Sequence, residues 1–101
     1  MNEFEVKNFT YRIKRMNAIE VLAFQSQISF DKYEDVLKMY NEILEKIEVK
    51  LDNTWLAVKA KGKDIYYPSG IEDDVIAIQE LVKHFLDYLK SVFQNSNASN
   101  D

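Results

Sequence analysis

The feature that most constrains this chain is a long amphipathic stretch at residues 69–93. Its apolar residues recur at alternating intervals of four and three positions, which is the spacing of one face of an α-helix. These residues are Ile71, Val75, Ile78, Val82, Phe85, Leu89 and Val92. Ser69 and Glu72 have the S-x-x-E spacing of a capping box, so we expect the helix to begin at Ser69. Its broad apolar face predicts that this helix is the packing spine of the fold.

Two other regions show the alternation of apolar and polar residues that is typical of β-strands. Residues 3–15 alternate around Lys7-Asn8, where Asn tolerates left-handed backbone, and this pattern predicts a hairpin or a bent strand. Residues 48–61 alternate around an Asp52-Asn53 turn, and a short extended segment follows at residues 65–67. The second region therefore predicts a β-meander. The alternation by itself leaves open whether the two regions join in one sheet.

A first helix is predicted to begin at Asn17, because Glu20 follows at capping-box spacing, and to extend to about residue 29. Its apolar residues lie on two opposite sides. One side carries Ile19, Leu22 and Ala23, and the other carries Val21, Phe24 and Ile28. A helix that is apolar all round is buried, either inside the monomer or against another protein chain. Both alternatives stay open at this point.

A second helix is predicted to begin at Asp31, with Glu34 three residues later, and to end near Ile47. The whole pattern predicts an α+β fold with an N-terminal β-hairpin, two helices, a short β-meander and a long C-terminal helix. A chain of 101 residues has room for one hydrophobic core, so we expect a single α+β domain over residues 1–93. Residues 94–101 contain no large apolar side chain, and we expect them to form a disordered polar tail.

Charge and hydropathy exclude several classes of partner. The chain has 13 Lys and Arg against 17 Asp and Glu, a net charge of −4, which argues against nucleic acid as the main partner. No apolar run approaches the roughly 20 residues of a membrane-spanning helix. The N-terminal residues also lack the basic and apolar regions of a signal peptide. We therefore expect a cytoplasmic protein with no nucleic-acid or membrane partner.

The residues that carry enzyme chemistry are scarce. His84 is the single histidine and there is no cysteine, so neither a catalytic triad nor a typical zinc site can be assembled. Glu72, Asp73 and Asp74 are consecutive, and on a helix their side chains would point about 100° apart. We expect them to compensate the helix dipole, not to bind a metal. The sequence predicts a protein that is not an enzyme, with no catalytic residue, metal site or cofactor.

Protein–protein contact is the remaining class of function. Trp and Tyr are favoured anchors of protein interfaces, and the strand region carries three such side chains. Ile76 lies outside the apolar face of the long helix, and the first helix has a second apolar side. The candidate protein-binding residues are Val21, Phe24, Ile28, Trp55, Tyr66, Tyr67 and Ile76. Core packing is the alternative for Trp55 and for one of the two tyrosines.

Three segments in fixed order carry a family resemblance. Residues 11–24 form a basic strand that ends in a Met-x-(Ala/Pro)-x-Glu helix start. The second segment is Ile47-Glu-Val-Lys-Leu followed by Trp55-Leu-Ala-Val58, and the third is Tyr67-Pro-Ser-Gly-Ile71 leading into the long helix. This order, together with the size and acidity, resembles the tail assembly chaperones of long-tailed, siphovirus-like bacteriophages. The resemblance covers about residues 9–93, and no motif in it identifies contact residues one by one.

The resemblance implies a function in tail morphogenesis. Such proteins coat the tape measure protein, keep it soluble and help to recruit tail tube subunits. They act in the host cytoplasm and are absent from the mature virion. In many of these phages, a ribosomal frameshift also produces a longer form. A homo-oligomer would follow separately, from apolar surface displayed on the first helix, Ile76 and the spare aromatic side chains. The alternative is a small phage-encoded interaction or inhibitor module that binds one folded host protein.

Overall fold

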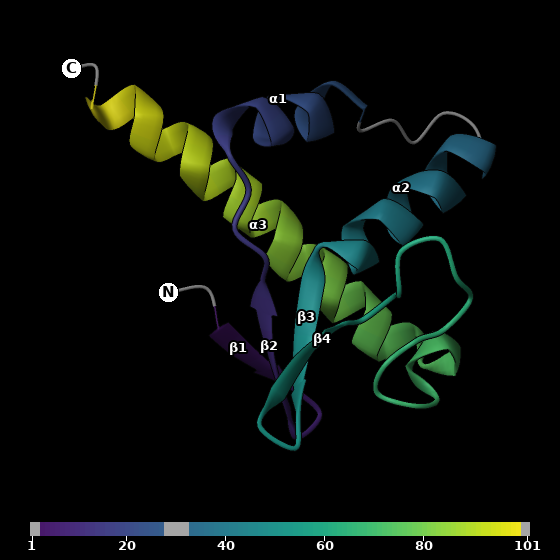
Figure 1. Ribbon diagram of the computed structural model, residues 1–101. Helices are drawn as coiled ribbons and strands as arrows, with labels where there is room; N and C mark the ends of the chain where they lie inside the picture. The colour runs from purple at the N-terminus through teal and green to yellow at the C-terminus, as the bar shows by residue number, and fades with distance from the viewer. Residues whose placement is uncertain (1–2, 28–32, 100–101) are drawn as a thin grey trace.

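The computed structural model describes residues 3–27 and 33–99 (Figure 1). The elements in chain order are β1 (Glu3–Val6), β2 (Phe9–Ile13), α1 (Ala18–Gln27), α2 (Tyr33–Glu45), β3 (Ile47–Leu51), β4 (Thr54–Ala57), the 3-10 helix η1 (Ile71–Asp73) and α3 (Val75–Ser99). The predicted α+β architecture is confirmed, with a hairpin, two helices, a second strand pair and a long C-terminal helix.

The four strands form one antiparallel sheet in the order β1-β2-β3-β4. The β1–β2 turn has positive φ at Lys7 and Asn8, 47° and 73°, and the β3–β4 turn has positive φ at Asp52 and Asn53, 49° and 63°. Two consecutive left-handed residues match the right-handed twist of the flanking strands, and Asn and Asp tolerate this backbone better than most residues. Both predicted turns are therefore confirmed.

The two β-regions join through β2 and β3, which pair antiparallel with Tyr11 opposite Val49 and Ile13 opposite Ile47. α1 and α2 form the connection between these two strands. The extended segment predicted at residues 65–67 does not form a strand. It contributes only an isolated bridge between Lys59 and Tyr66. The sheet is thus one surface with β1 and β4 at its edges.

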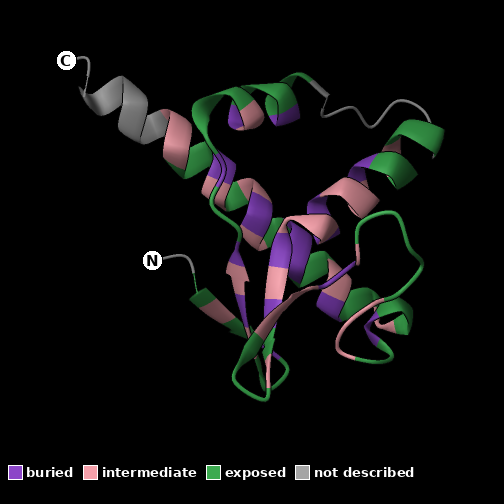
Figure 2. Cartoon of the chain, in the orientation of Figure 1, coloured by how far each residue is buried: buried purple, intermediate pink, exposed green. Residues whose placement is uncertain are grey.

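The core lies where α3 crosses behind the sheet and meets α1 and α2 (Figure 2). Leu81 and Phe85 of α3 have no exposed surface, and Tyr11 of β2 is 1% exposed. Burial, and secondarily the charge of Asp74, raises the pKa of Tyr11 to about 12, so its hydroxyl stays neutral at physiological pH. The expectation that the long helix is the packing spine is confirmed by this arrangement.

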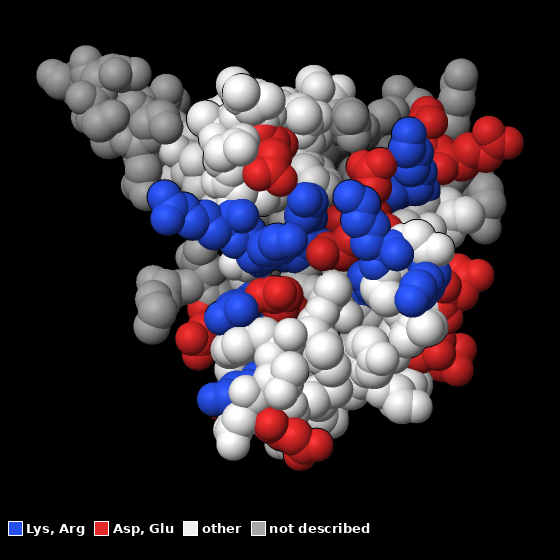
Figure 3. Space-filling view, in the orientation of Figure 1, with Lys and Arg blue, Asp and Glu red and all other residues white. Residues whose placement is uncertain are grey.

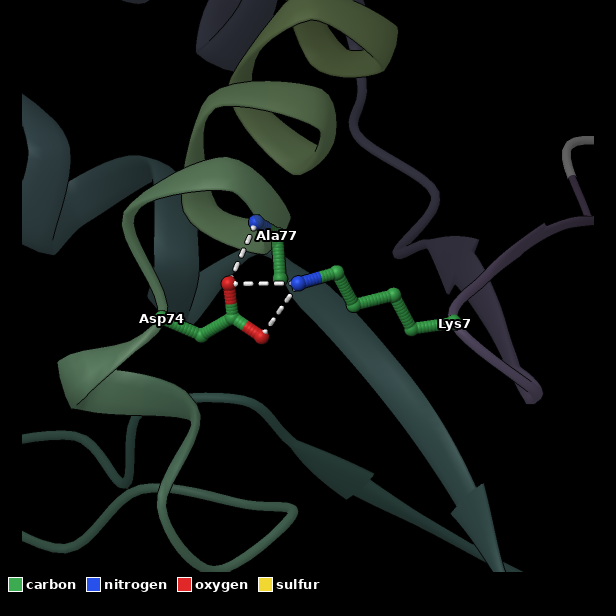
Figure 4. Close-up of polar contacts among 3 residues, drawn as sticks. All are labelled: Lys7, Asp74 and Ala77. Atoms are coloured by element: carbon green, nitrogen blue, oxygen red, sulfur yellow. Dashed lines mark hydrogen bonds and ion pairs between the residues drawn. The ribbon is translucent and has the colours of Figure 1, made fainter.

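The start of the long helix differs from the prediction. Gly70 has φ 91°, a left-handed conformation, whereas an N-cap at Ser69 would require helical φ near −63° at Gly70. The chain instead forms the short helix η1, and α3 begins at Val75. Asp74 is the N-cap, because its Oδ1 accepts a hydrogen bond of 3.1 Å from the amide of Ala77 (Figure 4).

The ends of two helices also differ from the prediction. α2 ends at Glu45, and Ile47 belongs to β3 instead of the helix. α3 extends past the predicted end at Phe93 to Ser99. The capping box of the first helix is confirmed, since the Glu20 amide donates to Asn17 Oδ1 at 2.9 Å and the Asn17 amide donates to Glu20 Oε1 at 3.3 Å.

Asp74→Ala tests the observed helix start. The substitution removes the cap and the two 2.9 Å hydrogen bonds from Lys7 Nζ to the Asp74 carboxylate. We expect the thermal midpoint to fall by about 5 °C, as for the loss of one N-cap in a domain of this size. Ser69→Ala is the matched control and should leave the midpoint unchanged. An equal fall in the thermal midpoint of the two variants would contradict the assignment of Asp74 as the N-cap of α3.

The same carboxylate predicts a pH dependence. The hydrogen bonds from Lys7, and then the amide of Ala77, lower the pKa of Asp74 from its ordinary value of 3.8. Because the folded-state pKa is depressed, the stabilisation is complete above the unfolded value and is lost as pH falls through the folded value. We expect the difference in thermal midpoint between the wild type and Asp74→Ala to shrink in acid below about pH 4, as measured by circular dichroism.

Candidate protein-binding surface

The side of α1 that was predicted to bind a partner lies in the core. Val21 is 4% exposed and Phe24 is 8% exposed. The Phe24 ring lies 5.1 Å from the ring of Phe85 on α3, tilted by 58°. Val21 and Phe24 are therefore largely buried in the monomer, where core packing accounts for both side chains. Ile28, the third residue of that set, lies outside the described residues.

The opposite side of α1 is exposed instead. Ile19 is 79% exposed and Leu22 is 55% exposed, and Ala23 is also exposed. An ion pair of 3.2 Å between Glu20 Oε2 and Lys46 Nζ joins α1 to the segment before β3. Hydrogen bonds from the Asn17 backbone and from Lys46 lower the pKa of Glu20, so this carboxylate is charged at neutral pH. The helix is therefore held with Val21 and Phe24 inward and with Ile19 and Leu22 in solvent.

Trp55 lies on the outer face of the sheet, away from α3. The guanidinium carbon of Arg12 sits 4.2 Å from the centre of the Trp55 ring, and Arg12 Nε donates to Glu48 Oε1 at 2.7 Å. These three residues come from β4, β2 and β3 and lie side by side across the sheet. Among the residues that the structure describes, no helix covers this part of the sheet (Figure 1). Trp55 is half-buried, so the Arg12–Trp55 pair leaves aromatic surface exposed.

The other predicted contact residues are dispersed. Tyr66 and Tyr67 are half-buried and pack against the core. Ile76 is 54% exposed in the first turn of α3, beside Val75, which is 68% exposed. The structure therefore does not bring the predicted residues together in one surface. The most exposed large apolar side chains lie instead on α1, at the start of α3 and on α2, where Leu37 is 50% exposed.

A groove of about 410 Å³ lies between α1 and α2 and reaches β4, and we call it the α1–α2 groove. Its apolar part consists of Ala23 and Phe24 of α1 and Ala57 of β4. Its charged part consists of Lys14, Lys46, Lys61, Glu20, Glu42 and Glu45. Figure 3 shows Lys and Arg gathered in a band across this face of the molecule, below the largely uncharged surface of α1. Sequence reasoning missed the groove because its residues come from distant segments.

Two polar side chains have structural roles. The His84 ring stacks on Phe4 with 4.1 Å between the ring centres, which fixes β1 against α3. Lys59 is 7% exposed and donates to Glu45 Oε2 at 3.3 Å and to the carbonyl of Lys63 at 3.0 Å. Within residues 3–27 and 33–99, no group of three or more His, Asp or Glu could hold a metal ion. In the same ranges, no helix is long and apolar enough to cross a membrane.

In comparisons with known protein families, with curated proteins and with solved structures, the chain matches none of them. The resemblance to tail assembly chaperones therefore stays a prediction, carried by the three segments in the sequence.

A pair of substitutions tests which side of α1 is accessible. Phe24→Ala removes a buried ring and should lower the free energy of unfolding by about 3–5 kcal/mol. Leu22→Ala removes an exposed side chain and should change it by less than about 0.5 kcal/mol. Chemical denaturation of both variants measures the difference. Similar losses in the two would show that both sides of α1 are buried.

Proposed function

We propose that this protein is a non-enzymatic tail assembly chaperone of a long-tailed bacteriophage, which binds the tape measure protein and helps to recruit tail tube subunits in the host cytoplasm. The resemblance of the segments at residues 11–24, 47–58 and 67–71 supports this proposal. The exposed apolar side of α1 supplies a surface of the kind that such a protein needs.

The observation that carries the proposal is the exposure of Ile19 and Leu22 on a helix with a single charged residue, Glu20. An exposed, uncharged helix face is suited to pack against an apolar stripe of a helical client. A stable interface buries about 800 Å² on each partner, far more than two side chains supply. One copy should therefore bind weakly, and a tail tube subunit could displace it.

Weak contacts also favour several copies on one client. A long helical client offers repeated apolar stripes, and adjacent copies that touch one another bind with a combined strength greater than that of each alone. The homo-oligomer expected from exposed apolar surface fits this arrangement. We therefore expect copies of the protein to associate with one another on the client, where binding brings them close together.

Co-expression with a tape measure fragment tests the function. We expect the wild-type chain to keep the fragment in the soluble fraction and to co-purify with it. Ile19→Ser combined with Leu22→Ser should abolish most of this effect without lowering the thermal midpoint, since both side chains are exposed. Leu37→Ser is the matched control, because Leu37 is 50% exposed on α2. Precipitation of the fragment to the same extent with and without the wild-type chain would refute the proposal.

The second candidate is an inhibitor module that binds one folded host protein. The observation that favours it is the Arg12–Trp55 pair on the open face of the sheet, since Trp and Arg are frequent interface hot spots. Trp55→Ala distinguishes the two when the co-expression assay is combined with affinity capture of the target from a lysate of host cells. A tail assembly chaperone that binds through α1 should tolerate this substitution, whereas an inhibitor should lose its single target.

A further inference from the structure

We propose that the α1–α2 groove binds an amphipathic helix of the partner whose apolar stripe is flanked by carboxylate side chains. This inference rests on the proposed function and names the kind of client segment that the chain recognises. It follows from how apolar and charged side chains adjoin along the groove.

The apolar side of α1 adjoins the groove at Ala23. Ile19 and Ala23 are four residues apart and therefore adjacent on the helix surface, and Ala23 lines the groove. Phe24 contributes the edge of a largely buried ring, and Ala57 of β4 lies on the far side. A partner helix could thus place its apolar stripe along Ile19, Ala23 and the groove. Small side chains at Ala23 and Ala57 leave room for the larger side chains of a partner.

The charges beside this apolar surface are unequal once ion pairs are taken into account. Glu20 is paired with Lys46 at 3.2 Å, and Glu45 is paired with Lys59 at 3.3 Å. Among the described residues, Lys14 and Lys61 of the groove have no ion-pair partner within 4.0 Å, and neither does Glu42. The groove therefore contains two unpaired ammonium groups, those of Lys14 and Lys61, and one unpaired carboxylate, that of Glu42.

Arg15 increases the imbalance. It is exposed, it follows Lys14 directly, and among the described residues it also has no ion-pair partner. Arg15 does not line the groove but shares an adjoining pocket with Lys14. With Arg15 included, the unpaired charges in and beside the groove are three cations and one carboxylate, on a chain whose net charge is −4. The groove is lined by three Lys and three Glu, and Lys59 and Arg15 beside it add two cations. This local excess of cations next to apolar surface, on an acidic molecule, disfavours basic partners and attracts acidic ones. The recognised helix should accordingly carry Glu or Asp beside its apolar stripe.

Two synthetic peptides test the inference. The first is a helix of about five turns with Leu at i, i+3, i+4 and i+7 spacing and Glu at the flanking positions. The second is identical except that Lys replaces every Glu. Titration of the labelled peptides with the wild-type protein, followed by fluorescence anisotropy, should show at least about tenfold tighter binding of the acidic peptide at low salt. Added salt should reduce the difference, because these charges are exposed.

Lys14→Glu combined with Lys61→Glu should weaken binding of the acidic peptide about tenfold, and the neutral pair Lys14→Gln and Lys61→Gln should weaken it about threefold. Lys38→Glu with Lys83→Glu is the matched control, because both lysines are exposed and neither lines the groove. Equal binding of the two peptides would overturn the inference. So would the absence of saturable binding, or binding that Lys14→Glu with Lys61→Glu leaves unchanged.

The outcomes separate this inference from the proposed function. Suppose that the variant with Lys14→Glu and Lys61→Glu still keeps the tape measure fragment soluble as the wild type does. The proposal that the groove binds the client is then overturned, while the proposed function stands. If the acidic peptide binds as expected but the wild type does not keep the fragment soluble, the function fails while the preference of the groove for acidic helices stands.

Discussion

The structure depends on the burial of one face of α3 against the inner face of the sheet. A sheet and a helix that are each apolar on one face must cover one another, because neither can bury that face alone. Leu81 and Phe85 supply fully buried side chains from the helix, and Tyr11 and Val49 supply them from the sheet. Phe24 of α1 then packs on Phe85, so the position of α1 follows from this same contact.

The N-terminal end of α3 is held by a second interaction that involves distant parts of the chain. Asp74 caps the helix and accepts hydrogen bonds from Lys7 in the β1–β2 turn, 67 positions away in the sequence (Figure 4). One carboxylate thus orients the helix and ties the hairpin to it. His84 stacks on Phe4 of β1 further along the same helix, so two contacts fix the edge strand against α3.

The surface is a consequence of this packing. With Val21 and Phe24 buried, the remaining apolar side chains of α1 lie in solvent, and α1 and α2 are left with a groove between them. The groove collects lysines from the segment before α1, from the segment before β3 and from the loop after β4. The proposed chaperone function and the proposed preference for an acidic helix both use the exposed side of α1 and the groove beside it.

The sequence by itself determined the elements whose causes are local. Alternation at residues 3–15 and 48–61 predicted the strands, Asn8 and Asn53 marked turns with positive φ, and the spacing of Asn17 and Glu20 predicted a helix start. The tertiary structure alone decided what depends on distant residues. Gly70 adopted φ 91° and moved the helix start from Ser69 to Asp74. The pairing of β2 with β3 joined the strands in one sheet. The contact of Phe24 with Phe85 of α3 accompanies the burial of one side of α1. Helical periodicity shows that α1 has two apolar sides but contains no information on which of them meets the core, because that choice depends on side chains far away in the sequence.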